Sequence, residues 1–110
     1  MPILRAGTPK AVPEWADFSD WGVSRMPDGQ HVGRHFHDSG EFVLIISGRV
    51  KVDTEGMVEE LGPGDAVLTK MGDEHEWWAL EESVAIWAVS RLMGQKRPGH
   101  LIRTRQQDGW

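Results

Sequence analysis

Apolar residues along this chain occur in short runs that alternate with polar residues or end at glycine. The plainest run is 41–47, EFVLIIS, which lies between Gly40 and Gly48 and is too short for a typical helix. Similar runs, each bounded by turn residues, occupy 18–25, 32–36, 50–53, 58–61, 66–69, 75–80 and 84–90. The pattern predicts a β-strand for each of these segments.

Glycine-rich segments separate the expected strands. Turns are expected at 27–29, 62–65 and 71–74, and residues 54–57 are expected to form a hairpin. No segment before residue 90 shows a sustained helical period. About eight short strands at a spacing of about 8–12 residues are typical of an all-β barrel or sandwich.

The chain has 110 residues, which is the length of one compact domain. Residues 1–14 contain three prolines, which disfavour a helix and predict an extended N-terminal arm. The β-domain is then expected over 15–90, followed by a tail over 91–110. That tail carries five basic residues and one acid, whereas residues 1–90 carry 7 basic and 16 acidic residues.

This charge asymmetry suggests two roles for the tail. It is expected to fold over the acidic domain of its own or a partner subunit, because opposite net charges attract. The alternative is contact with an anionic ligand or nucleic acid. The overall charge of -5 argues against nucleic-acid binding, which needs a cationic surface.

Composition narrows the chemistry and the compartment. Cysteine is absent, which excludes disulfides, thiolate nucleophiles and iron–sulfur clusters, so a metal site needs histidine and carboxylate ligands. No apolar run is long enough to span a membrane, and the first ten residues lack the apolar core of a secretory signal. A cytoplasmic location with no membrane partner is therefore expected.

Three histidines and one glutamate form the candidate site. His35 and His37 are two residues apart and project from one face of a strand, Glu41 opens the next strand, and His75 follows a turn. If these side chains converge, they can bind one divalent transition metal: Mn, Fe, Ni, Co, Cu or Zn. Four ligands in an octahedral shell would leave two positions for water, O2 or a chelating substrate. The alternative is a histidine pair on an exposed strand face.

The spacing of these residues from the glycines resembles the two signature motifs of the cupin superfamily. The first motif is matched at every position, by Gly29, His35, His37, Glu41 and Gly48. The second is matched by Gly64, Gly72 and His75, while Lys70 replaces its proline and Ala79 its asparagine. Both departures lie outside the metal-binding positions. The matched region spans residues 29–79.

This resemblance to single-domain cupins implies a fold, a site and a partner. The fold is the small cupin β-barrel, a double-stranded β-helix or jelly roll. The metal ligands carry over to His35, His37, Glu41 and His75. Cupins commonly dimerise, so a homodimer is expected.

Three further residues are candidates for the lining of the pocket. His31 is expected to be an exposed polar residue near a turn; the alternative, since it shares strand parity with His35, is a position at the mouth of the barrel. Trp77 shares parity with His75 and is expected to point inward, and Trp87 lies in the last strand. These tryptophans either pack in the core or form an aromatic wall for a sugar ring or aromatic substrate.

Two functions are compatible with these features. The first is a metal-dependent enzyme of isomerase, lyase or dioxygenase type, acting on a small polar metabolite such as a sugar derivative or keto acid. The second is a non-catalytic module that binds or senses a metabolite. The complete ligand set favours the enzyme, although fold-level analogy does not select a reaction.

Overall fold

Residues 1–90, which the computed structural model describes, contain eight β-strands and no helix. The strands are β1 (Phe18–Met26), β2 (His31–His35), β3 (Glu41–Ser47), β4 (Val50–Thr54), β5 (Met57–Leu61), β6 (Ala66–Thr69), β7 (His75–Ala79) and β8 (Ser83–Ser90). Residues 1–17 contain neither strand nor helix. The expected tail over 91–110 lies outside the described residues.

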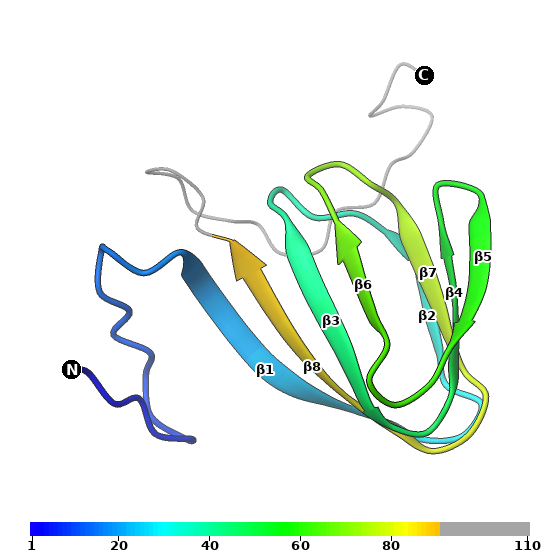
Figure 1. Ribbon diagram of the computed structural model, residues 1–110, viewed down its shortest axis with the longest axis horizontal. Coiled ribbons are helices and arrows are strands. Elements are labelled where there is room, and N and C mark those ends of the chain that lie inside the picture. The colour runs from blue at the N-terminus through cyan, green and yellow to red at the C-terminus, as the bar shows by residue number, and fades with distance from the viewer. Residues whose placement is uncertain (91–110) are drawn as a thin grey trace.

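The strands form two antiparallel sheets that face each other (Figure 1). The first sheet has the order β1-β8-β3-β6, and the second has the order β2-β7-β4-β5. This arrangement confirms the predicted all-β jelly roll. Within the described residues, however, the two sheets remain separate and do not close into one hydrogen-bonded barrel.

The core lies between the two sheets. It contains Ile45 and Val50, which are fully buried, and it continues through Val52, Trp77 and Ala85. These residues come from β3, β4, β7 and β8, and alternation along each strand directs them to the inner face. Burying one such large apolar side chain stabilises the fold by about 1.5–3 kcal/mol.

The turn between β3 and β4 depends on Gly48. Its φ is 86°, a left-handed conformation that side chains with a Cβ rarely adopt. A Cβ at this position would lie 2.2 Å from Ser83 Oγ and 2.4 Å from the carbonyl oxygen of Glu82. This signature glycine therefore has a structural role, because it lets the turn pack directly against the start of β8.

Membrane insertion through a helix has no support in the described part of the chain. None of its segments forms a helix of the length and apolarity needed to cross a bilayer.

Candidate metal centre

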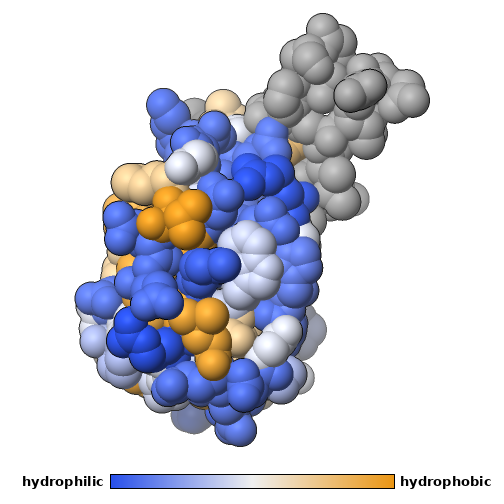
Figure 2. Space-filling view, turned by 90° about the vertical axis from the view of Figure 1, so that its right-hand side faces the viewer, coloured by the Kyte–Doolittle hydropathy of each residue, from blue (hydrophilic) through white to orange (hydrophobic). Residues whose placement is uncertain are grey.

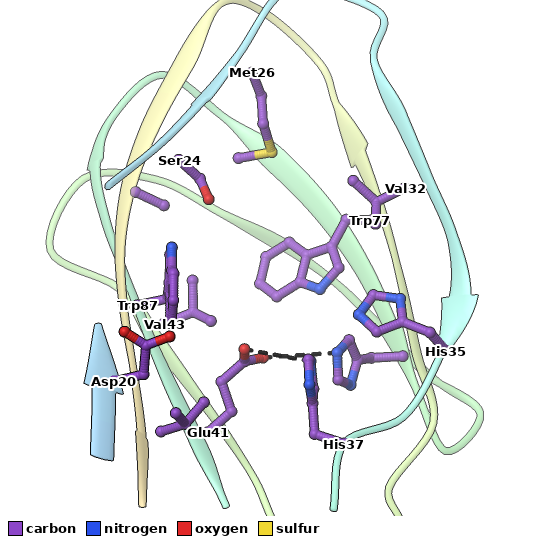
Figure 3. Close-up of a pocket in the computed structure, with 13 residues that line it drawn as sticks. Asp20, Ser24, Met26, Val32, His35, His37, Glu41, Val43, Trp77 and Trp87 are labelled. Carbon is purple, nitrogen blue, oxygen red and sulfur yellow. Dashed lines mark ion pairs between the residues drawn. The ribbon is translucent and has the colours of Figure 1, made fainter. Parts of the chain in front are cut away.

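A cavity of about 410 Å³ lies between the sheets (Figure 3). Its lining comes from both sheets and from the segment after β2: Asp20, Ser24, Met26, Val32, His35, His37, Glu41, Val43, His75, Trp77, Ala85, Trp87 and Val89. Most of these side chains are apolar. The histidines and the two carboxylates are therefore its main polar features.

Three buried histidines gather in this cavity. One ring nitrogen from each of His35, His37 and His75 can be chosen so that all three lie within 4.8 Å of one another. The ring centroids of His35 and His75 are 4.3 Å apart, and those of His37 and His75 are 5.1 Å apart. His75 is the most enclosed of the three, with 1% of its surface exposed.

Strand pairing explains how residues forty positions apart meet. His35 at the end of β2 pairs directly with His75 at the start of β7. Directly opposite residues of an antiparallel pair project from the same face, so both rings enter the cavity. His37 follows His35 by two residues and its ring also faces the cavity (Figure 3).

The orientation of His35 is set by the backbone. Its Nδ1–H donates a hydrogen bond to the carbonyl oxygen of Gly33 at 2.8 Å. A carbonyl oxygen only accepts, so in the neutral imidazole this bond leaves the ring's lone pair on Nε2. Metal-binding histidines in proteins are commonly oriented by a second hydrogen bond of this kind.

Glu41 approaches the histidines from the other sheet, at the start of β3. Its Oε2 lies 3.3 Å from His37 Nε2, and its Oε1 lies 3.6 Å from His75 Nε2. The set of ligand atoms that lie within 4.8 Å of one another comprises the three histidines and not Glu41. Its negative charge beside two imidazoles favours a cation between them.

These residues fit a divalent transition metal. Two imidazole nitrogens bound to zinc at about 2.1 Å each lie no more than about 4.2 Å apart. The nitrogens here lie within 4.8 Å of one another, so small side-chain rotations would bring them to this spacing. Imidazole and carboxylate donors suit several first-row metals, and the donor set does not single out one of them.

The structure places the two candidate tryptophans in the cavity wall. Trp77 follows His75 by two residues and lies between the histidines and Met26 (Figure 3). Trp87 projects from β8 and its ring lies over Gly22 of β1, where a Cβ would approach the ring to 2.6 Å. Gly22 thus makes room for the indole.

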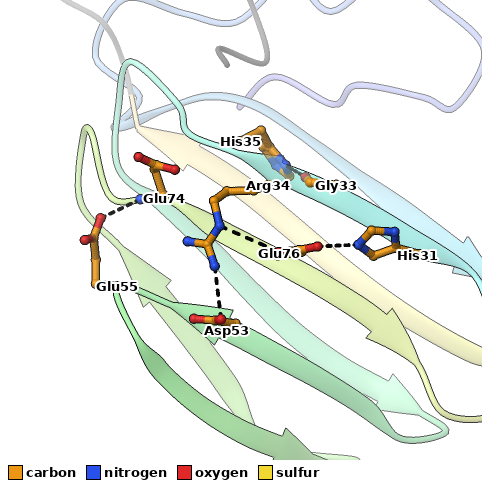
Figure 4. Close-up of polar contacts among 8 residues, drawn as sticks. All are labelled: His31, Gly33, Arg34, His35, Asp53, Glu55, Glu74 and Glu76. Carbon is orange, nitrogen blue, oxygen red and sulfur yellow. Dashed lines mark hydrogen bonds and ion pairs between the residues drawn. The ribbon is translucent and has the colours of Figure 1, made fainter. Parts of the chain in front are cut away.

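His31 is exposed and lies outside the cavity, so the alternative that it lines the mouth is wrong. Its ring stacks on Trp78 with centroids 5.2 Å apart, and its Nε2 is 2.5 Å from Glu76 Oε2 (Figure 4). The pairing of β2 with β7 shifts register between Val32 and His35. This irregularity inserts one residue and reverses the strand parity, so His31 and His35 face opposite sides.

Sequence reasoning missed Asp20 and Ser24, which line the cavity from β1. Both share parity with Met26, which is buried in the core. That shared parity was the available signal. It was insufficient because β1 alternates only loosely between polar and apolar residues.

The comparisons with known proteins agree on the fold. Residues 22–90 match the family model described as "Cupin domain". A Klebsiella pneumoniae protein with a double-stranded β-helix domain is 22% identical with a TM-score of 0.63, covering 80% of this chain and 78% of that one. An Escherichia coli ribosomal oxygenase, YcfD, is 25% identical with a TM-score of 0.67, covering 72% of this chain and 24% of the oxygenase.

Two further similarities concern proteins with named activities. A predicted oxalate decarboxylase from Thermotoga maritima is 21% identical with a TM-score of 0.61, covering 66% of this chain and 65% of that one. "Polyketide synthase CurC" of Streptomyces cyaneus is 26% identical over 83 residues, which are 73% of this chain. The chain spans about half (54%) of the length of that protein. Since the cupin model covers more than half of the chain, this protein belongs to the cupin family.

Proposed function

We propose that this cupin is a metal-dependent enzyme acting on a small polar metabolite, such as a sugar derivative or a keto acid. The carrying observation is the convergence of three buried histidines and Glu41 on one cavity. At about 410 Å³, the cavity falls in the size range of small-molecule sites. Its chemistry is proposed to be of isomerase, lyase or dioxygenase type.

The chain's own residues have distinct roles in this proposal. His35, His37 and His75 would hold the metal through nitrogen, and Glu41 would add a carboxylate oxygen. When bound, the metal would act as a Lewis acid on a substrate oxygen. The hydrogen bond from His35 to Gly33 keeps one ligand oriented before the metal arrives.

The apolar walls complete the site. Trp77 and Trp87, together with Val43 and Val89, present apolar surface on the side of the cavity beyond the metal ligands. Charge interactions are stronger where water is excluded. Two similar structures carry enzyme names, a predicted oxalate decarboxylase and a ribosomal oxygenase, which supports catalysis on this fold without selecting a substrate.

Activity is expected to depend on a bound metal. Purified protein should hold about one divalent transition metal per chain, and a screen of keto acids and uronates should find turnover. Chelation should abolish that turnover, and adding the metal back should restore it. The measurements are elemental analysis and substrate-consumption assays.

Two outcomes would count against this function. Protein that holds no stoichiometric metal after loading would contradict the metal site itself. Tight metabolite binding by metal-loaded protein without turnover would instead support the binding or sensing module.

We also infer that the protein forms a homodimer through the outer face of the first sheet. On this face, apolar residues that are paired across the four strands form two rows. One row is Trp21, Ala88, Phe42 and Leu68, and the other is Val23, Ile86, Leu44 and Ala66. Leu68 is 74% exposed, and Val23 and Ile86 are also exposed. On the opposite side of the molecule, hydrophobic side chains form separate patches among hydrophilic ones (Figure 2).

A second copy of this chain suits the apolar face better than a charged partner does. Neither row contains a charged side chain, so two copies related by a twofold axis would bury apolar surface on both sides. None of the acidic residues of 1–90 stands in either row. Packing the rows of two copies against each other would therefore bring no like charges together.

The dimer is tested by light scattering of the full chain. Wild-type protein should have twice the 12.4 kDa chain mass. Leu68→Glu should be monomeric, because it places a charge in the interface. Val58→Glu, a matched change at a 55% exposed residue on β5, should remain dimeric. A monomeric wild type, with residues 91–110 covering the face, would contradict the inference.

A further inference from the structure

The cavity has two chemically different walls. His35 and His75 come from β2 and β7 of the second sheet, whereas Asp20 and Ser24 come from β1 of the first. Figure 3 shows Asp20 beside Trp87, across the cavity from His35. A molecule bound to the metal with one end would therefore extend its other end toward β1.

Asp20 is held in place from two directions. Its Oδ1 accepts hydrogen bonds from the backbone N–H of Trp21 at 2.9 Å and from Lys10 Nζ at 2.5 Å. Lys10 belongs to the N-terminal segment, and its Nζ also contacts the carbonyl oxygen of Trp21. The ammonium lies 4.9 Å from the Trp21 ring centroid and 5.7 Å from that of Trp87. The N-terminal segment thus positions the carboxylate at the cavity.

The charges around the cavity favour one kind of ligand group at this wall. Among the described residues, the lining contains carboxylates and histidines but no lysine or arginine. The neighbouring cation, Lys10, is already paired with Asp20. A ligand carboxylate here would lie beside the Asp20 carboxylate and apolar surface, with no lysine or arginine of the described lining to pair with it, which is costly. A hydroxyl or amino group would instead donate a hydrogen bond to Asp20.

The middle of the cavity is apolar. Trp77 and Trp87 present indole rings, and Val43 and Val89 add aliphatic surface. Flat or ring-shaped molecules bury the most area against such walls. The walls therefore favour a ring between the metal-binding end and the β1 end.

We infer that the substrate is a ring compound with metal-chelating oxygens at one end and a hydroxyl or amino donor at the other, and that Asp20 determines this specificity. The chelating end rests on the proposed function. The donor end rests on Asp20, Trp87 and the absence of a cationic side chain from the described lining. The two parts are therefore tested separately.

Two matched probes test the donor end. The probes are 3,4-dihydroxybenzylamine and 3,4-dihydroxybenzoate, which share the chelating oxygens and the ring but differ in the charge of the distal group. In zinc-loaded protein, calorimetry should show that the amine binds at least about 10-fold more tightly, since each 1.4 kcal/mol changes affinity tenfold. In Asp20→Asn this preference should fall to about threefold or less, because the amide carries no negative charge.

A matched control isolates the role of Asp20. Asp28→Asn makes the same chemical change at an exposed turn residue and should retain the full preference. Zinc content should be unchanged in both variants, because neither residue is among the metal ligands. Equal affinity for the two probes, or a preference that survives Asp20→Asn, would overturn the inference.

The outcome is distinguishable from failure of the proposed function. If the protein holds no zinc, the metal proposal fails. Benzylamine and benzoate, which lack the two ring hydroxyls, then test the specificity of Asp20 separately. Nuclear magnetic resonance titration should still show tighter binding of benzylamine, with the difference lost in Asp20→Asn. No difference between these two probes would overturn the specificity assigned to Asp20.

Discussion

Replacing His75 by alanine is expected to lower metal affinity by at least about 100-fold. Losing a residue that merely orients a ligand already costs 10–100-fold in comparable sites, so losing a ligand should cost at least as much. His75 contributes the most buried ring of the three-histidine group. The measurement is elemental analysis of protein loaded with one divalent metal, supported by calorimetric titration.

Controls separate loss of the metal from loss of the fold. His37→Ala should behave like His75→Ala, and both variants should keep the circular dichroism spectrum of a β-protein. His31→Ala removes an imidazole that is 48% exposed on the outer face, so metal content should stay at the wild-type level. Glu41→Ala should weaken metal binding less than the combined loss of His37 and His75. Full metal occupancy in His75→Ala would contradict the site.

Replacing Gly48 by alanine is expected to destabilise the fold by about 3 kcal/mol. A left-handed backbone costs a residue with a Cβ about 1–2 kcal/mol, and overpacking adds about 1–3 kcal/mol. Two of the three clashing atoms, Glu82 O and Ser83 Cα, are backbone atoms, so the contact cannot be relieved by rotating a side chain. The expected drop in melting temperature is roughly 10 °C or more.

Gly56→Ala provides the matched comparison. Gly56 has a similar φ of 82°, but a Cβ there meets no heavy atom within 4 Å. Only the backbone cost remains, so the loss should be about 1–2 kcal/mol. Denaturant unfolding of both variants measures the difference. Equal losses would show that the contact with β8 contributes nothing.

The strands were predictable because the signals that define them are local. Residues 41–47 were expected as a strand, and the structure has β3 with those bounds. The segment 18–25 became Phe18–Met26, and 32–36 became His31–His35, one residue earlier. Alternation and glycine turns act over a few residues, so they specify strands without knowledge of the partners.

Strand parity failed where pairing was irregular. The alternative that placed His31 at the mouth assumed uninterrupted alternation to His35, and one inserted residue between Val32 and His35 reverses it. Such a bulge depends on how β2 meets β7, forty residues later in the chain. Nothing near His31 in the sequence reports it.

The sequence alone determined an all-β chain and the residue types and spacing of a cupin metal site. These properties depend on side-chain chemistry and short-range alternation. Only the tertiary structure decided that His35 pairs with His75, that Glu41 reaches them from the other sheet, and that Lys10 positions Asp20 on the opposite wall. These features arise from contacts between residues distant in the chain, which the packing of two sheets creates and local pattern cannot encode.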